Sequence, residues 1–287
     1  MTVVFVALVL AFFFGLALLL TQPGLRHMGP LRGACVAVPT ASLVFVVLWP
    51  WTVGFGTWNA QGALVFAAVG GLFPALVTIL TVAANERLGP ALTGALGNLA
   101  PLFAVLIAVV TLGEAPDGLQ LVAVLVIVLG VMMLYLRPGA AAKTTLRWIF
   151  LLPLAAAFVR GLVQPAVKVG LADWPNPFAA VSIGYVVSAL VVLAVNGLRR
   201  RGWPVAYDRK GWKWFALVGL CNGAAVFFLY QALALGPVIQ VAPLVASYPV
   251  VTLLLGRLFP GIGGGIAPAT WLGVGLTVAG VMMLLSH

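Results

Sequence analysis

Residues 98–134 read NLAPLFAVLIAVVTLGEAPDGLQLVAVLVIVLGVMML, and this stretch decides the fold of the chain. It holds two apolar runs that are separated only by a short polar break around residues 113–117. A helix needs about 20 apolar residues to cross the hydrocarbon core of a bilayer. The stretch therefore predicts two membrane-spanning helices joined by a tight connection.

Runs of the same kind fill the rest of the chain. Of its 287 residues, 63% are hydrophobic and 7% are charged, and the mean hydropathy is +1.19. Soluble domains are roughly half apolar and one-quarter charged. The longest connection, residues 198–212, is too short to hold a soluble domain. We therefore expect an all-α polytopic membrane protein with ten transmembrane helices, at residues 2–21, 31–50, 62–85, 91–112, 118–136, 148–171, 178–197, 213–234, 239–258 and 269–286.

Four short motifs occur in the same order in both halves of the chain. They are AFFFGL (11–16) and AFVRGL (157–162), FAAVG (66–70) and FALVG (215–219), LGP (88–90 and 235–237), and GVMML (130–134 and 280–284). Their offsets lie between 146 and 150 residues, which indicates an internal duplication. We expect two five-helix repeats, residues 1–138 and 147–287. Because five is an odd number, the second repeat is inverted in the membrane relative to the first, as in many secondary transporters.

A second set of motifs points to a known family. They are NLAPL (98–102) and TLGE (111–114) in the first half, and YQAL (230–233), VAPL (241–244) and YP (248–249) in the second. Through these motifs the whole chain resembles the EamA-type transporters of the drug/metabolite transporter superfamily. The resemblance implies efflux of amino acids or related metabolites. The second half departs from the pattern, because LFPG at 258–261 stands where the family has Leu-Gly-Glu, so the carboxylate of Glu114 has no counterpart there.

The charged residues predict the orientation of the chain. Fifteen Lys and Arg against five Asp and Glu give a net charge of +10, too scattered for a nucleic-acid surface, so the expected partner is the lipid bilayer. Thirteen of the fifteen fall in connections on one side, among them Arg137, Lys143 and Arg199–Arg201. Positive loops stay in the cytoplasm, so both termini are expected outside it, in a multi-pass protein of the inner (plasma) membrane. All nine tryptophans lie at or beyond predicted helix ends, where indoles sit at headgroup level.

The two remaining cations lie in the run 148–171. Arg160 is at its centre, and Gln164 and Lys168 follow at spacings of four, which places all three on one stripe of a helix. Intramembrane charges are costly and mark functional sites, so we expect Arg160 to bind an anionic group of a substrate, most plausibly a carboxylate. In the alternative reading, helix carbonyls and water satisfy Arg160, which only locks the two halves. Lys168 lies nearer the outer end, where it can snorkel, with Asp173 as a possible partner.

Other polar residues inside the runs are candidates for hydrogen bonds to a substrate. They are Asn98, Tyr185, Asn222, Tyr230, Gln240, Ser247 and Tyr248. For each of them, an interhelical hydrogen bond that packs the bundle is the alternative. None of the five acidic residues is central in a run.

These observations predict a secondary-active exporter of small amphipathic metabolites, amino acids or other carboxylate-bearing compounds, working by alternating access around a midplane cavity. One alternative is a broad-specificity drug or metabolite carrier with Arg160 structural. Another is a membrane enzyme, but His27, Glu86 and Glu114 form no catalytic constellation, so we expect no catalytic residues. No metal or cofactor is expected, since Cys35 and Cys221 stand alone in apolar runs and Gly261–Gly265 lacks a phosphate-loop context. The partners are the bilayer and a small-molecule substrate, with no nucleic acid, and the oligomeric state is left open, a monomer included.

Overall fold

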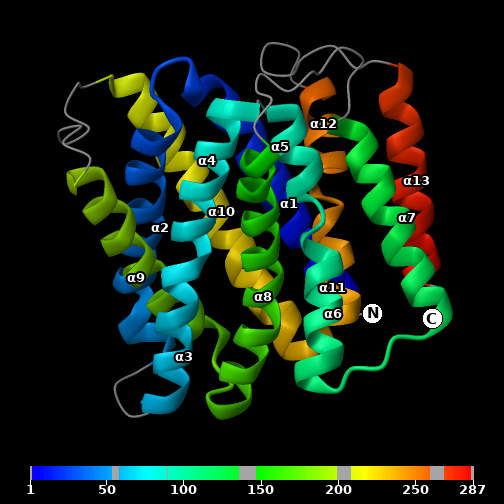
Figure 1. Cartoon of the computed structure of the whole chain (residues 1–287). Helices are drawn as coiled ribbons and strands as arrows, with labels where there is room; N and C mark the ends of the chain where they lie inside the picture. The colour runs from blue at the N-terminus through cyan, green and yellow to red at the C-terminus, as the bar shows by residue number, and fades with distance from the viewer. Residues whose placement is uncertain are drawn as a thin grey trace.

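The computed structural model describes residues 2–53, 58–88, 90–135, 147–198, 208–258 and 268–285, and all regular structure in these ranges is helical (Figure 1). The helices are α1 (Thr2–Leu25), α2 (Pro30–Thr52), α3 (Ala60–Gly70), η1 (Gly71–Leu76, π-helical), α4 (Val77–Leu88), α5 (Pro90–Gly97), α6 (Ala100–Leu112), α7 (Gly118–Tyr135), η2 (Arg147–Phe150, a 3₁₀ turn), α8 (Leu151–Asp173), α9 (Pro177–Leu198), α10 (Arg209–Leu235), α11 (Val238–Ala246), α12 (Tyr248–Leu258) and α13 (Pro268–Leu285).

Eight of the helical stretches in the described ranges are long and apolar enough to cross a membrane. They coincide with eight of the predicted runs, and four of them combine two or three consecutive elements, such as α11 with α12. The predicted runs 118–136 and 269–286 form α7 and α13, whose apolar parts, Gly118–Met133 and Trp271–Leu284, are shorter. The chain is therefore a helical, multi-pass membrane protein, and the count of ten spans remains a prediction.

Three spans are interrupted near the middle of the bundle. Phe73, just before Pro74, has φ −138° and ψ 131°, which breaks the helix between α3 and α4. The break between α5 and α6 falls at residues 98–99, and that between α11 and α12 at Ser247. A proline follows each break within three residues and cannot donate to the helical ladder, so carbonyls are freed there. Side chains add hydrogen bonds beside two of the breaks: Asn98 Nδ2 donates to Gly94 O (2.7 Å), and Ser247 Oγ to Leu244 O (2.7 Å).

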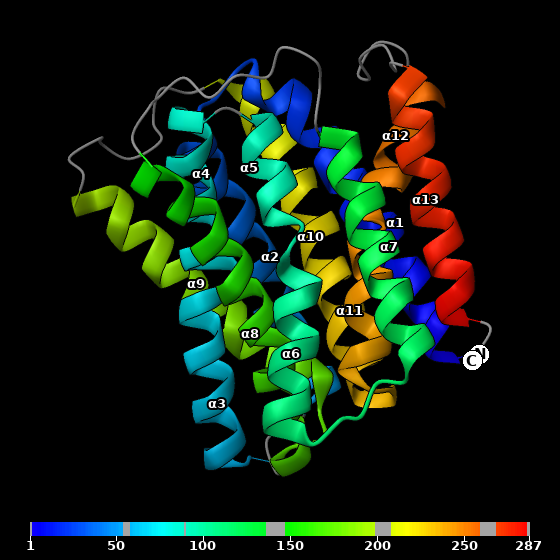
Figure 2. The ribbon, with the colours of Figure 1, turned by 45° about the vertical axis from the view of Figure 1, so that its right-hand side comes forward.

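The bundle has two distinct ends (Figures 1 and 2). At the terminal end, α1 begins and α13 stops; at the opposite, charged end, α1 ends and α2 and α10 begin. The basic residues described at the charged end are Arg26, Arg32, Arg87, Arg147, Arg209, Lys210, Lys213 and Arg257. Arg137, Lys143 and Arg199–Arg201, which the orientation argument also used, lie outside the described residues.

An aromatic cluster closes the terminal end. The Trp174 side chain is 5% exposed and packs against Trp58 (ring centroids 5.5 Å apart), Phe66 (6.1 Å) and Trp49 (6.4 Å). Trp174 lies at the end of α8, as the sequence predicted, but its ring is buried within the protein because α2 and α3 supply rings that cover it. Asn59 reinforces the cluster by donating from Nδ2 to Asp173 O (3.1 Å).

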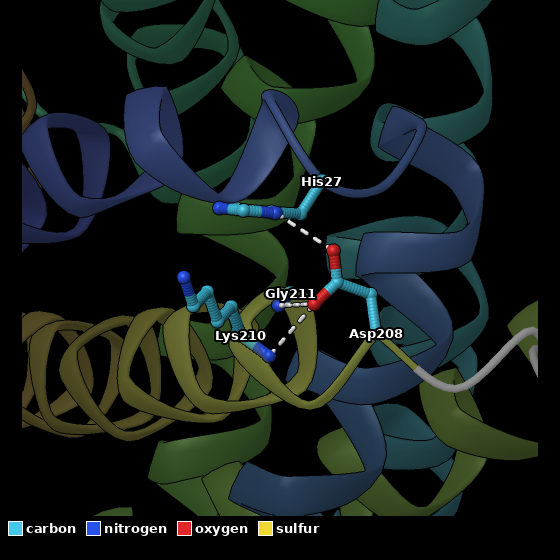
Figure 3. A network of polar contacts seen from close by, with 4 residues as sticks. All are labelled: His27, Asp208, Lys210 and Gly211. Carbon is cyan, nitrogen blue, oxygen red and sulfur yellow. Dashed lines mark hydrogen bonds and ion pairs between the residues drawn. The ribbon is translucent and has the colours of Figure 1, made fainter.

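A polar contact joins the α1–α2 connection to the start of α10 at the charged end (Figure 3). Asp208 caps α10 by accepting from Lys210 N (2.9 Å) and Gly211 N (3.4 Å), and its other oxygen lies 2.7 Å from His27 Nδ1. Partial desolvation alone would raise the pKa of the Asp208 carboxyl, but the Lys210, His27 and Gly211 hydrogen bonds outweigh it. The pKa of Asp208 therefore lies below its ordinary value.

Candidate functional site

A cavity of about 370 Å³ opens between two groups of helices, from the middle of the bundle to the charged end. On one side stand α1, α2 and α10, called the α10 wall; on the other stand η1, α4 and α8, called the α8 wall. Leu25, Pro30 and Asn85 line its charged end, and Arg160, Gln164 and Tyr185 line its inner part. The volume is within the range of small-molecule sites.

Arg160 lies half-buried on α8 and lines this cavity. Among the described residues it has no hydrogen-bond or ion-pair partner, and no other charged residue lines the cavity. Its orientation follows from the packing of α8: the neighbouring Gly161 faces α6 so closely that a Cβ there would lie 2.9 Å from Ala100 O. With Gly161 against α6, the adjacent residue is left on the cavity side.

Gln164 is the second polar group of α8 in the cavity, one turn beyond Arg160. Its side chain is only 4% exposed, and its Oε1 is buried without a hydrogen-bond partner among the described residues. A buried amide oxygen without a partner costs free energy, about 1–3 kcal/mol for such groups. Together with Arg160 it makes an unsatisfied polar pair in a mostly apolar lining.

Three other predicted site residues also line the cavity: Tyr185, Asn222 and Tyr248. The Tyr248 ring lies 5.8 Å from that of Phe14, and the Tyr185 ring 5.5 Å from that of Phe45. Phe14 lines the cavity as well, and the internal duplication aligns it with Arg160 of the second half. The structure thus brings together five of the ten predicted residues in one space.

Five predicted residues lie outside the cavity lining: Lys168, which is described below, and four uncharged ones. Asn98 and Ser247 are buried and donate to carbonyls of their own helices at the two breaks. Tyr230 is 2% exposed within the main apolar core, and Gln240 lies half-buried on α11. These two hydrogen bonds lie within one span each, so they are neither substrate contacts nor the interhelical bonds of the alternative interpretation.

Lys168 does not extend the cavity stripe, and its partner is not Asp173. Its Nζ donates to Gly236 O and lies 3.5 Å from Glu114 Oε1 at the terminal end. The Glu114 carboxylate also accepts from Val238 N (2.9 Å) and Ile239 N (3.0 Å), which caps the N-terminus of α11. We call these five residues the Lys168 tie. It joins α8 to the α10–α11 junction, so the two walls that the cavity separates are connected here.

No role was predicted for Glu114 from the sequence, although the Leu-Gly-Glu motif that contains it held a signal for one. Gly113 has φ +66°, the left-handed conformation that ends α6 and turns the chain so that the next residue faces α11. The Leu-Gly-Glu motif encodes this turn and cap together. A second missed signal is the stripe Thr78, Thr81 and Asn85, which lines the cavity and has the spacing of one helix face.

The described part of the chain offers no cluster of three or more His, Cys, Asp or Glu side chains that could hold a metal ion. The polar side chains in the cavity lining include one guanidinium (Arg160), three amides (Asn85, Gln164 and Asn222) and two phenols (Tyr185 and Tyr248). All of them can donate hydrogen bonds, and apolar and aromatic surface surrounds them.

Comparisons with known proteins agree with this architecture. The sequence model described as the EamA-like transporter family matches residues 1–136 and 146–286. An uncharacterized transporter from the cobO 3′ region of a Sinorhizobium species is 31% identical over 137 residues, which are 48% of this chain and 95% of that relative. A solved crystal structure, described only as that of a protein, has a TM-score of 0.82 at 17% identity and covers 98% of this chain and 96% of its own. That last similarity concerns the fold alone.

Proposed function

The chain belongs to the EamA-like transporter family, and on this premise we propose that it is a secondary-active exporter of small amphipathic metabolites that carry a carboxylate, amino acids among them. The observation that carries the proposal is Arg160, a cation without a protein partner in the one cavity described above. A transporter role also accounts for the lack of a catalytic constellation around the cavity.

The chemistry of Arg160 favours an anionic ligand. A guanidinium stays charged at any physiological pH and presents a fork of donors that matches a carboxylate. Leaving it unpaired inside a bilayer is costly, and an arriving carboxylate supplies the missing counter-charge. The Gln164 amide, one turn away, offers a further hydrogen bond to the same ligand.

The repeat architecture supports alternating access. We propose two inverted five-helix repeats, 1–138 and 147–287, which together form ten spans; the family matches at 1–136 and 146–286 are consistent with these bounds. The breaks α5/α6 and α11/α12 fall at corresponding places of the two repeats, about 149 residues apart. Broken spans at corresponding positions mark the substrate site of many transporters.

We place the charged end in the cytoplasm and both termini outside, in the plasma membrane. The basic residues at that end support this orientation by the positive-inside rule. The cavity then opens to the cytoplasm, where an exported substrate would enter. For release on the other side, the walls must separate at the terminal end, so the Lys168 tie and the contacts of Trp174 must break there.

The test is a transport panel in proteoliposomes. Radiolabelled amino acids, organic acids and quaternary amines are offered to wild-type protein, Arg160→Gln and the control Arg32→Gln, whose side chain is exposed at the charged end. We expect uptake of carboxylate compounds that is lost in Arg160→Gln and kept in Arg32→Gln. Transport of cations alone would overturn the proposal. Equal transport of neutral hydrophobic compounds by all three proteins would favour the broad-specificity carrier instead.

Orientation has a separate test. A cysteine added beyond His287 should react with an impermeant maleimide in intact cells if the termini are outside. Reaction only after permeabilisation would place the charged end outside and reverse the proposed direction of the cavity.

A further inference from the structure

We infer that the cavity selects small monocarboxylates with an apolar body and without an ammonium group, in preference to the corresponding zwitterionic amino acids. This inference rests on the proposed function, because it assumes that Arg160 is the anion site. It narrows the substrate class from carboxylates in general to those with a single net negative charge.

The first argument is the charge inventory of the cavity. Arg160 is the sole charged residue among the described residues that line it, so no carboxylate is there to pair with an ammonium group. Two of the acids are engaged elsewhere, Glu114 in the Lys168 tie and Asp208 in the cap of α10. The remaining acids, Glu86, Asp117 and Asp173, are exposed at the ends of the bundle.

The second argument concerns neutral acceptors, which could replace a carboxylate. Broken helices often offer free carbonyls to cations, but here several carbonyls beside the breaks already accept hydrogen bonds. Ser188 Oγ donates to Gly70 O and Thr78 Oγ1 to Pro74 O (2.7 Å) beside η1, and Asn98 serves Gly94 O. The open acceptors that remain in the cavity are neutral, among them the unpartnered Gln164 Oε1, and a neutral oxygen can accept from an ammonium group without supplying the counter-charge of a carboxylate.

The third argument is the position of the ammonium in a bound amino acid. With the carboxylate on Arg160, the α-ammonium would lie on the order of 5–6 Å from the guanidinium carbon, close enough for strong like-charge repulsion in a medium of low dielectric. Ring faces such as that of Tyr248 attract cations, but less strongly than this repulsion and the lost hydration oppose them.

The rest of the cavity suits an apolar body. Its lining beyond the polar pair is dominated by aliphatic and aromatic side chains, with Phe14, Phe73 and Phe215 supplying rings. The volume of about 370 Å³ is large enough for a phenyl or branched alkyl group attached to a carboxylate. A ligand of this kind neutralises Arg160 and leaves no charge of its own unpaired.

The experiment compares matched ligands that differ only in the ammonium group. Purified protein in detergent is titrated by calorimetry with 3-phenylpropionate against phenylalanine, and with 4-methylpentanoate against leucine. We expect the deaminated member of each pair to bind at least about tenfold more tightly. Arg160→Gln should lose that binding, while Arg32→Gln should retain it.

A gain-of-charge variant sharpens the test. Asn222→Asp places a carboxylate of nearly the same shape in the cavity and should shift the preference toward phenylalanine and leucine. Equal or tighter binding of amino acids by the wild-type protein, lost in Arg160→Gln, would overturn the inference and leave the proposed function standing. Absence of any Arg160-dependent carboxylate binding would overturn both. The wild-type ranking decides the inference even if the Asn222→Asp protein does not fold.

Discussion

Two cations on the same helix have opposite surroundings. Lys168 is bound by Glu114 and the carbonyl of Gly236, whereas Arg160, two turns earlier and about 12 Å away along α8, has no partner among the described residues. Both charges face the cost of leaving bulk water. Contacts within the protein offset this cost for Lys168 and leave it unbalanced for Arg160, which supports a structural role for Lys168 and the proposed ligand-binding role for Arg160.

The same contrast separates the two ends of the bundle. At the terminal end the Lys168 tie and the Trp174 cluster hold the α8 and α10 walls together. At the charged end the cavity opens, and the His27–Asp208 contact lies within the α10 wall instead of crossing between the walls. Substitutions in the Lys168 tie and substitutions in the cavity should therefore differ in the sign as well as the size of their effect on folding stability.

The largest effect on stability should come from Lys168→Met. It leaves the largely buried Glu114 carboxylate, 11% exposed, without its cation, and breaking such a pair costs about 3 kcal/mol. The melting temperature in detergent should fall by several degrees, and a cysteine introduced at the buried Leu171 should become more reactive toward maleimide.

The double variant Lys168→Met/Glu114→Gln is the matched control, because it removes both charges. It should recover most of the lost stability, since no unpaired charge remains. Strictly additive losses in the double variant would show that Lys168 and Glu114 do not act as a pair.

The next prediction concerns Arg160→Met, whose effect on folding stability should be opposite in sign to that of Lys168→Met. Arg160→Met removes a charge that makes no contact within the described protein, so the melting temperature without ligand should stay equal or rise. Affinity for the carboxylate that the wild-type protein binds should fall by roughly 30- to 100-fold, as expected for loss of a desolvated charge pair. If Arg160→Met lowers the melting temperature as much as Lys168→Met does, Arg160 stabilises the fold and the contrast between the two cations is wrong.

A smaller contrast is expected between two buried amides. Asn98→Leu removes the hydrogen bond to Gly94 O and should cost about 1 kcal/mol of folding free energy. Gln164→Met removes an amide oxygen that has no partner, so stability should stay equal or rise while ligand affinity falls several-fold. Chemical denaturation and calorimetry on the two variants measure both quantities. Equal destabilisation by the two substitutions would contradict an open site at Gln164.

Much of this contrast could be predicted from sequence, and the limits have physical causes. Bilayer thickness sets the length of a span, so runs of apolar residues located the helices to within a few residues. The spacing of four placed Arg160 and Gln164 on one face, because that relation is local to a helix. The partner of Lys168 could not be derived in this way, since Glu114 is 54 residues away and reaches it only through the packing of α6, α8 and α11.

The burial of Trp174 could not be predicted from sequence, for the same reason. Its place at a helix end is local information and matches an interfacial tryptophan, but its neighbours Trp49 and Phe66 come from other helices. The four uncharged polar residues outside the cavity lining lie in apolar runs just as those inside it do. Local pattern distinguishes polar from apolar faces, whereas the tertiary arrangement decides which polar face meets a cavity.

The smallest effect should come from the contact that does not cross between the walls. Asp208→Asn weakens the cap of α10 and the link to His27 within the α10 wall, so it should lower the melting temperature slightly at pH 7 and leave ligand affinity unchanged. Because the folded pKa of Asp208 is lowered, its contribution is complete above the ordinary carboxyl value of 3.8 and disappears as the pH falls through the folded value. The difference in melting temperature between wild-type and Asp208→Asn should therefore shrink below about pH 4. Asp173→Asn, at an exposed carboxylate of the terminal end, serves as control. A difference that persists undiminished at pH 2.5, or a loss of ligand affinity in Asp208→Asn, would mean that the charged-end contact acts across the cavity after all.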